Sequence, residues 1–478
     1  MTKLRSKTTH SLKWSAIERI ATQAIQLIVM LILGRIIGPE AFGLIGMLAI
    51  FIAVAQTFID SGFSNALIRK QDANEADYAT TFYFSVAVAL VCYLLLFISA
   101  PYIADFYQQP ALTALTQILA LTIVANAFST VQRTQLITRM DFKTQAKASL
   151  LSVVLSTLLA IAAAVMGLGV WALVIQTLSF AVSNTLMLNL YLRWHPKTGF
   201  SKESFSYLFG FGSKLLLSGL IDTIYNNVYQ IIIGKLFTAG QLGFFTQAKN
   251  LTYMPSLTLT AIIQRVTYPM MSQIQHDKDA LESAYLLTLR LAAVAIFPLL
   301  IGLAIIAEPF LGLVLGTEWQ PAAIFMSILA LGYMLYPIHS INLNLLQVKG
   351  RSDLFLKLEI IKKIMITIVL VITVPLGIKA ICIGIAVQSY IALLINTYYT
   401  GKLTSLSIRI QLVKLMPVWA ISVISGVLAW LISRYTDNQI LELVSMLIIM
   451  PIIYIAAIRL MLPDLFQHIY STILKKKN

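Results

Sequence analysis

The residues of this sequence that could do chemistry are charged and amide side chains lying inside long apolar stretches. An unpaired charge in hydrocarbon is costly, so charges in such positions are rare and usually functional. Basic groups there attract anions, and short acids and amides beside them complete a polar, water-filled cavity. Seven residues form this candidate set: Arg19, Asp60, Lys214, Asp222, Asn226, Lys249 and Arg265.

The depth of each basic residue in its stretch separates two interpretations. Arg19 and Lys214 each lie about 10 Å from the inner start of their stretch, and Arg265 lies near the inner interface. Their long side chains can reach the headgroups by snorkelling, so anchoring and cavity lining both stay open for these three. Lys249 lies about 13 Å below the outer surface, where no basic loop explains it. We therefore expect Lys249 to line a cavity.

The two acids have short side chains that cannot reach water from the middle of a span. Asp60 and Asp222 therefore need a polar cavity or a basic partner. Asp222 is followed by Asn226, Asn227 and Gln230, which together cover more than two helical turns. Such a face is too polar for lipid, although hydrogen bonding between helices is an alternative role for it.

Other polar residues carry weaker signals. His339 is the histidine placed within a predicted span, where a packing role competes with a proton relay. Cys92 and Cys382 fall in separate spans and indicate neither a disulfide nor a metal site. We find no phosphate-binding glycine loop and no catalytic triad spacing. The sequence therefore predicts no cofactor, no metal and no enzyme activity, and leaves open a coupling ion, proton or sodium.

The elements that position these residues are transmembrane helices. The chain is 58% hydrophobic and 12% charged, its mean hydropathy is +0.82, and a span needs about 20 mainly apolar residues. We predict an all-α polytopic membrane protein. Its fourteen expected spans are approximately 12–37, 41–68, 79–100, 113–137, 147–166, 170–192, 207–236, 241–272, 286–307, 321–348, 355–375, 378–401, 411–433 and 440–461.

The net charge of +15 does not indicate a nucleic-acid partner, because the basic residues fall in alternate loops. The loops on the side of the amino terminus hold most of them, while the opposite loops hold only Arg35, Lys235, Lys379 and Arg434. The positive-inside rule then places both termini in the cytoplasm. An even number of spans is required for this, which agrees with fourteen.

An internal repeat organises the spans. Three segments recur in chain order at offsets of 200, 210 and 208 residues: Gly34-Arg-Ile-Ile-Gly-Pro-Glu-Ala-Phe-Gly43 as Gly234-Lys-Leu-Phe-Thr-Ala-Gly-Gln-Leu-Gly243, Ile118-Leu-Ala-Leu121 as Ile328-Leu-Ala-Leu331, and Leu168-Gly-Val-Trp-Ala-Leu173 as Leu376-Gly-Ile-Lys-Ala-Ile381. We predict two six-helix lobes in parallel orientation, 1–200 and 201–403, and an appended pair of spans with a basic tail, 404–478. The central charges lie in the first two spans of each lobe, so the lobes are expected to face each other across a central cavity.

Several motifs resemble a known family. They are the turn Gly34-Arg-Ile-Ile-Gly-Pro-Glu-Ala-Phe-Gly-Leu44, the segment Asp60-Ser-Gly-Phe63, and the inner loops Met140-Asp-Phe-Lys143 and Lys349-Gly-Arg-Ser-Asp353. The chain resembles the polysaccharide-transport branch of the multidrug/oligosaccharidyl-lipid/polysaccharide exporter superfamily. This resemblance implies a bacterial inner-membrane flippase that moves a polyprenyl-diphosphate-linked oligosaccharide to the outer leaflet by alternating access.

The expected partners are this lipid-linked oligosaccharide and the membrane lipids, with a polysaccharide polymerase and glycosyltransferases as further candidates. Two other functions stay open. A cation-coupled drug antiporter of the same superfamily would share the fold, but it would favour acidic over basic cavity residues. An integral-membrane polymerase would need a reactive group of residues at an interface, which the short outer loops do not offer.

Overall fold

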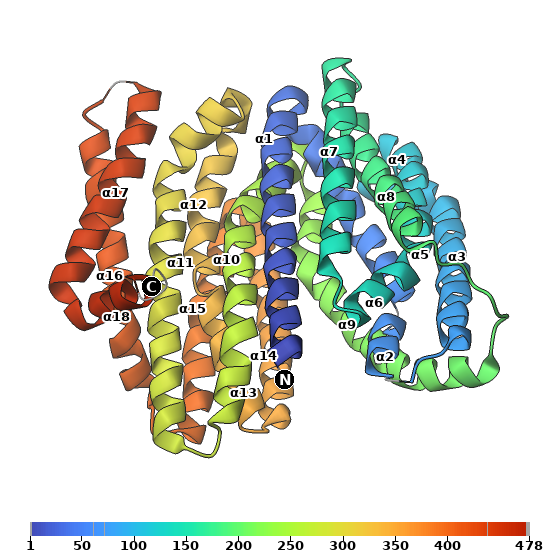
Figure 1. Ribbon diagram of the computed structural model, residues 1–478. Coiled ribbons are helices and arrows are strands. Elements are labelled where there is room, and N and C mark those ends of the chain that lie inside the picture. Colours follow the sequence, from blue (N-terminus) through green and yellow to red (C-terminus); the bar gives the residue numbers. More distant parts are fainter. Residues whose placement is uncertain (1, 61, 71, 437, 475–478) are drawn as a thin grey trace. The chain divides into compact units, whose positions relative to one another are not determined.

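The computed structural model describes residues 2–60, 62–70, 72–436 and 438–474, and these residues form helices and no strand (Figure 1). The expectation of an all-α chain is confirmed. The chain folds into two compact units, residues 1–243 and 244–478.

The first unit contains α1 to α9. Their bounds are α1 Thr2–Asp60, α2 Phe63–Arg69, α3 Glu75–Tyr107, α4 Ala111–Leu119, α5 Leu121–Ala127, α6 Thr130–Thr138, α7 Phe142–Val165, α8 Trp171–Leu192 and α9 Lys202–Leu236. Helix α10, Ala239–Gln273, begins in this unit and continues into the second.

The second unit contains the rest of α10 and all later helices. Their bounds are α11 Lys278–Val314, η1 Thr317–Trp319, α12 Pro321–Tyr333, α13 Tyr336–Val348, α14 Ser352–Thr373, η2 Val374–Leu376, α15 Ile378–Leu403, α16 Ile408–Ser433, α17 Gln439–Met461 and α18 Pro463–Leu474.

Ten helices in the described part of the chain are long and apolar enough to cross a membrane, or eleven if the bent pair Ala111–Ala127 and Thr130–Thr138 is one span. The protein is therefore a multi-pass membrane protein, as predicted. One of the ten is the 52-residue stretch Glu18–Arg69, within which α1 breaks at Gly38. Gly38 has a φ of 74° and is followed by Pro39. The proline ring disfavours the helical conformation of the residue before it, so the helix breaks at Gly38.

The two repeated turns approach each other within the first unit. A Cβ atom on Gly43 would lie 1.7 Å from the carbonyl oxygen of Ala239, and one on Gly243 would lie 1.9 Å from that of Pro39. Residues 39 and 43 correspond to 239 and 243 at the sequence offset of 200, so the two contacts are reciprocal. Only glycine allows backbones this close.

Left-handed backbone positions recur along the chain at the offsets of the sequence repeat. Gln108, Met140 and Gly169 have φ values of 54°, 57° and 55°. Gly316, Gly350 and Gly377, at 104°, 69° and 90°, follow them by 208, 210 and 208 residues. Positive φ values therefore occur at corresponding helix ends and turns of the two halves, which is consistent with a duplicated unit.

In the second unit, α11, α12, α15, α16 and α17 run side by side (Figure 1). A buried polar network joins four of its helices. The Tyr285 hydroxyl of α11 lies 2.8 Å from the amide oxygens of both Asn342 on α13 and Gln411 on α16. Thr400 of α15 donates to the same two oxygens at 3.2 Å. The predicted appended span at 411–433 is thus fixed to the body of the unit.

Candidate functional site

The structure divides the seven predicted site residues between the two units. Asp60 is the last residue of α1, Arg19 lies near its start, and Lys214, Asp222 and Asn226 lie on α9, all within the first unit. Lys249 and Arg265 lie on the part of α10 that belongs to the second unit. Their assignment to one substrate cavity stays a prediction.

Asp60 is exposed and belongs to a chain of amide hydrogen bonds. Gln56, one turn earlier, donates its Nε2 to Asp60 at 3.3 Å, and Asn126 of α5 donates to the Gln56 oxygen at 3.2 Å. The Arg133 guanidinium of α6 also interacts electrostatically with the Asp60 carboxylate. The expectation that this acid requires a polar or basic environment is consistent with these contacts.

The helices that carry Asp60 and Asp222 pack closely through small residues. Thr57 and Thr223 are hydrogen-bonded through their hydroxyls at 3.0 Å, and a Cβ on Gly219 would meet the Thr57 methyl group at 3.3 Å. Further along the same seam, a Cβ on Gly62 would lie 2.8 Å from the backbone of Gly212. Small residues at a helix seam let polar side chains bond across it, which is typical of membrane helices.

The remaining site residues of α1 and α9 are exposed or partly buried. Arg19 is partly buried, and its neighbour Glu18 accepts hydrogen bonds from Gln145 at 3.2 Å and Ser149 at 2.9 Å. Lys214 and Asn226 are exposed. An exposed lysine fits both snorkelling and cavity lining, so these positions do not decide between the two interpretations.

Lys249 is partly buried on α10. One turn further along, the Tyr253 ring packs against Tyr333 and Tyr336, with ring centroids 5.1 and 5.2 Å apart. Ser256 then donates to the Tyr333 carbonyl oxygen at 2.9 Å. These contacts fix α10 against α12 and α13 directly beside Lys249.

Arg265 lines a pocket of about 400 Å³ within the second unit. The pocket is lined by Ala261, Gln264, Arg265, Tyr268, Asn344 and Gln347. The first four are spaced as one face of α10, and the last two as one face of α13. Gln264 also donates to the Ser340 hydroxyl, which ties the two helices together.

The pocket around Arg265 is lined mainly by side chains that can donate hydrogen bonds. Five of its six lining side chains carry an N–H or O–H donor, one of them is a guanidinium, and none is an acid. Guanidinium and amide donors suit phosphate and carboxylate groups. Sequence reasoning identified Arg265 but missed Asn344, because nothing in the spacing along the chain shows that α13 lies against α10.

A second group that sequence reasoning missed lies on α14. Glu359 forms ion pairs with Lys362 at 2.5 Å and Lys363 at 4.0 Å. These residues lie about 6–12 Å into the predicted span that begins at 355, at depths similar to those of Arg19 and Lys214. From the sequence we placed the central charges in the first two spans of each lobe and did not consider these residues, although their helical spacing of three and four could have revealed the ion pairs.

His339 is satisfied as a neutral ring. Asn396 donates its amide to Nδ1 at 3.2 Å, which leaves Nε2 to donate to Ser389 Oγ at 3.1 Å. Ser389 in turn donates to the Gly332 carbonyl at 2.8 Å. Both ring nitrogens of His339 have a partner in the neutral tautomer, so the geometry favours packing over a proton relay.

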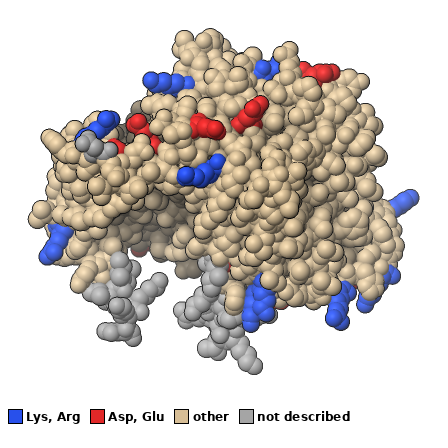
Figure 2. Space-filling model, turned by 90° about the horizontal axis from the view of Figure 1, so that it is seen from above, with Lys and Arg blue, Asp and Glu red and all other residues tan. Residues whose placement is uncertain are grey.

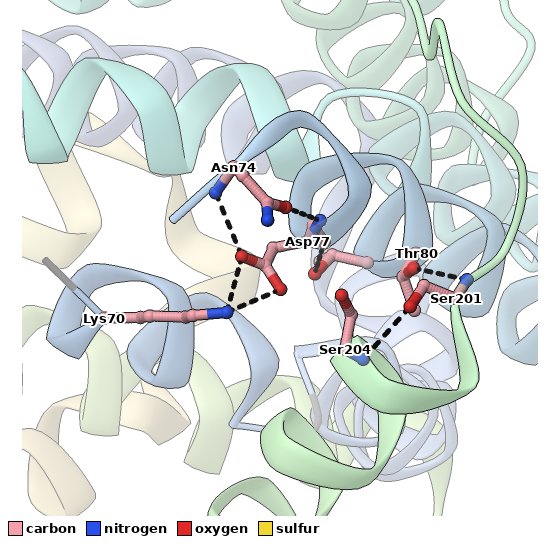
Figure 3. Close-up of polar contacts among 7 residues, drawn as sticks. Lys70, Asn74, Asp77, Thr80, Ser201 and Ser204 are labelled. Carbon is pink, nitrogen blue, oxygen red and sulfur yellow. Dashed lines mark hydrogen bonds and ion pairs between the residues drawn. The ribbon is translucent and has the colours of Figure 1, made fainter. Parts of the chain in front are cut away.

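A polar junction joins the start of α3 to the linker before α9 (Figure 3). Asp77 is fully buried, pairs with Lys70 at 2.8 Å, and forms a capping box with Asn74. The Ser201 backbone N–H donates to Thr80 at 3.0 Å, while the Ser201 side chain caps α9. Hydrogen bonding to the Asp77 carboxylate raises the pKa of Lys70, so this lysine stays charged at neutral pH.

The face shown in Figure 2 carries its charged side chains singly or in small groups among uncharged residues. This face offers no continuous basic patch of the kind that nucleic acids require. Among the described residues, no group of three or more His, Cys, Asp or Glu side chains is placed to hold a metal ion.

Comparison with known proteins identifies the family. A model of the polysaccharide biosynthesis protein family matches residues 32–324, which is more than half of the 478 residues. The chain belongs to this family. The resemblance inferred from the repeated turn and the inner loops is thereby confirmed.

Two curated relatives of this polysaccharide biosynthesis protein match over most of its length. The teichuronic acid biosynthesis protein TuaB of Bacillus subtilis is 26% identical over 429 residues, covering 89% of each chain. The lipopolysaccharide biosynthesis protein WzxC of Escherichia coli is 26% identical over 397 residues, covering 82% of this chain and 80% of the relative.

Solved structures with the same fold include a flippase and a multidrug transporter. The lipid II flippase MurJ in an inward closed conformation aligns with a TM-score of 0.77 at 14% identity, covering 94% of this chain and 99% of that one. An inward-facing multidrug resistance MATE transporter aligns with a TM-score of 0.63 at 18% identity, covering 82% and 98%.

Proposed function

We propose that this protein is a transporter that flips a polyprenyl-diphosphate-linked oligosaccharide from the cytoplasmic to the outer leaflet by alternating access. The observation that carries the proposal is the donor-lined pocket around Arg265 between two membrane helices. The names of TuaB and WzxC, and the fold shared with a lipid II flippase, support the same substrate class.

The physical reason is the cost of moving a charged headgroup through hydrocarbon. An ionised group without partners costs several kcal/mol or more in an apolar medium. A pocket with a guanidinium and four neutral donors replaces part of the water that the diphosphate gives up. Arg19, Lys214 and Lys249 would supply further positive charge along the path, while the lipid tail stays in the bilayer.

We further propose fourteen spans. The stretch Glu18–Arg69 is about 78 Å long if helical throughout, which is enough for two crossings of a core about 30 Å thick. Helices α10 and α14, with 35 and 22 residues, are also long enough to cross, although their charges lower their hydropathy. Adding these three crossings to the eleven gives fourteen, with both termini on the cytoplasmic side of the bacterial inner membrane.

The two lobes of six spans, 1–200 and 201–403, and the appended pair within 404–478 remain part of this proposal. The repeated left-handed positions support the duplication. Helix α9, assigned to the second lobe, packs against α1, α2 and α3. A coupling ion, a polymerase and glycosyltransferases remain candidate partners without residues assigned to them.

A drug antiporter is the second candidate, favoured by the alignment with the MATE transporter. Its substrates and coupling ions are cations, so it would favour acidic cavity residues, whereas the pocket at Arg265 contains none. A polymerase finds no support in the relatives or the fold.

Flipping by reconstituted protein tests the proposal. Vesicles carrying the lipid-linked oligosaccharide on both leaflets should expose the inner pool to an externally added, membrane-impermeant glycosidase only when the protein is present. A cationic drug efflux assay on the same vesicles separates the two candidates, because efflux without flipping would favour the antiporter.

A further inference from the structure

Asn344 is a buried side chain whose amide nitrogen lacks a hydrogen-bond partner. It lies on α13, is 5% exposed, and its Nδ2 atom bonds to no other group. A buried donor left without an acceptor destabilises the folded protein. In native structures such a group is accounted for by strain, by a bound water or ion, or by a functional role.

Its neighbour Asn342, two residues earlier on the same helix, shows that the fold can satisfy a buried amide here. Asn342 is fully buried, donates to the Ile338 carbonyl at 2.8 Å, and accepts from Tyr285 and Thr400. The two asparagines therefore differ in one respect. Asn342 belongs to a closed network, whereas Asn344 lines the pocket that contains Arg265.

The surroundings of the Asn344 amide indicate what its missing partner is. The lining contains the Arg265 guanidinium and the amides of Gln264 and Gln347, and it contains no carboxylate. A pocket of donors without an acidic acceptor is complementary to an anion with several oxygens. At about 400 Å³ the pocket has room for a diphosphate-sized group.

We propose that Asn344 donates its amide to a phosphoryl oxygen held by Arg265, and that these residues form the subsite for the diphosphate of the transported lipid. This inference rests on the proposed function and assigns α13, as well as α10, to the site. Arg265 attracts the anion through its charge and donates N–H groups in the guanidinium plane, while Asn344 fixes the position of the anion, because its buried amide donates only along its two N–H directions.

Two substitutions at Asn344 separate this role from a structural one. Asn344→Leu keeps a similar volume and removes the unpaired donor, so thermal stability should stay equal to wild type or rise. Binding of inorganic pyrophosphate, measured by calorimetry on detergent-solubilised protein, should weaken by about 10- to 100-fold. Asn344→Asp places an anion beside Arg265 and should abolish pyrophosphate binding without loss of stability.

Asn342→Leu is the matched control on the same helix. It breaks the network with Tyr285 and Thr400, so it should lower the unfolding temperature while the folded fraction binds pyrophosphate normally. If Asn344→Leu instead lowers stability and leaves pyrophosphate affinity unchanged, Asn344 is a structural residue and the inference is wrong.

Thermal protection by two different lipids identifies the source of the phosphoryl group. In nanodiscs, polyprenyl diphosphate should protect wild-type protein against heat more than it protects Asn344→Leu, whereas phosphatidylglycerol should protect both equally. A difference that appears only with phosphatidylglycerol would overturn the assignment to the transported lipid. Wild-type protein that binds polyprenyl diphosphate through Asn344 but flips no oligosaccharide would refute the proposed function and leave the subsite intact.

Discussion

Alanine at Gly43 or Gly243 should force the two repeated turns apart. Ordinary contact begins at about 3.4 Å, but the added Cβ would lie 1.7 Å from the Ala239 oxygen or 1.9 Å from the Pro39 oxygen. The carbonyls must therefore recede by about 1.7 Å (3.4 − 1.7) or 1.5 Å (3.4 − 1.9). Both are backbone atoms of helices and cannot swing aside as a flexible side chain would.

The energetic cost follows from overpacking, which is typically about 1–3 kcal/mol for an added methyl group. Alanine also favours a helix over glycine by up to about 1 kcal/mol, which opposes this cost. Gly240→Ala isolates that gain, because a Cβ there meets nothing within 4 Å in the same turn. Relative to Gly240→Ala, Gly43→Ala should reduce the population of molecules whose two turns are in contact by roughly 5- to 140-fold.

Electron–electron distance measurements between spin labels at Glu40 and Gln241 would report the separation, since both positions are exposed and each lies in one turn. Cys92 and Cys382 must first be replaced by serine. Gly43→Ala should shift the distribution to longer distances, and Gly240→Ala should not. An unchanged distribution for Gly43→Ala would show that the close approach is not required by the fold, and would refute the reasoning.

Three further changes have expected outcomes. Lys70→Gln should lower the unfolding temperature at neutral pH, because buried Asp77 loses its charged partner. Asp77 raises the pKa of Lys70 above its ordinary 10.5, so the stabilisation is present below 10.5 and is lost as the pH rises through the raised value. A deficit that keeps its size as the pH rises through that range would contradict this. Gln411→Leu should cost about 1–3 kcal/mol of folding free energy, because the buried Thr397 and Leu406 carbonyl oxygens lose the amide that donates to them and Tyr285 loses one of its two acceptors. Thermal unfolding measures this cost, and an unchanged midpoint would show that the network is dispensable. Lys249→Glu should impair flipping more than Lys249→Ala, with Lys249→Arg partly active in an assay at matched protein levels; normal flipping by Lys249→Glu would leave Lys249 as a packing residue.

The sequence contains enough information to predict the local structure but not the neighbours of each helix. The repeated turn at Gly43 and Gly243 was visible because glycine is required where backbones touch, and its partner lies at a constant offset. Apolar length similarly located the spans. The contact of α9 with α1 rests on small residues such as Gly219, whose role depends on a facing helix that spacing along the chain does not identify.

The same limit determines which residues of the candidate site could be predicted from the sequence. Arg265 was predictable because a charged residue within an apolar stretch can be recognised from the sequence alone. Asn344 was not, since a buried asparagine such as Asn342 has the same sequence signature and differs only in its hydrogen bonds. Glu359 pairs with both Lys362 and Lys363, which leaves one net positive charge, and only helical spacing reveals these pairs from the sequence.

A comparison of flipping by purified wild-type protein and by Arg265→Gln, each in vesicles of the same composition, tests the central claim most directly. The assay is the fraction of lipid-linked oligosaccharide that an external glycosidase can cleave, with protein-free vesicles as the baseline. Loss of one charged partner should slow flipping by about tenfold or more. We expect wild type to approach complete cleavage while Arg265→Gln, at equal protein content and unfolding temperature, lags behind it; wild-type vesicles that stay at the protein-free baseline, or equal rates for the two proteins, would contradict the account.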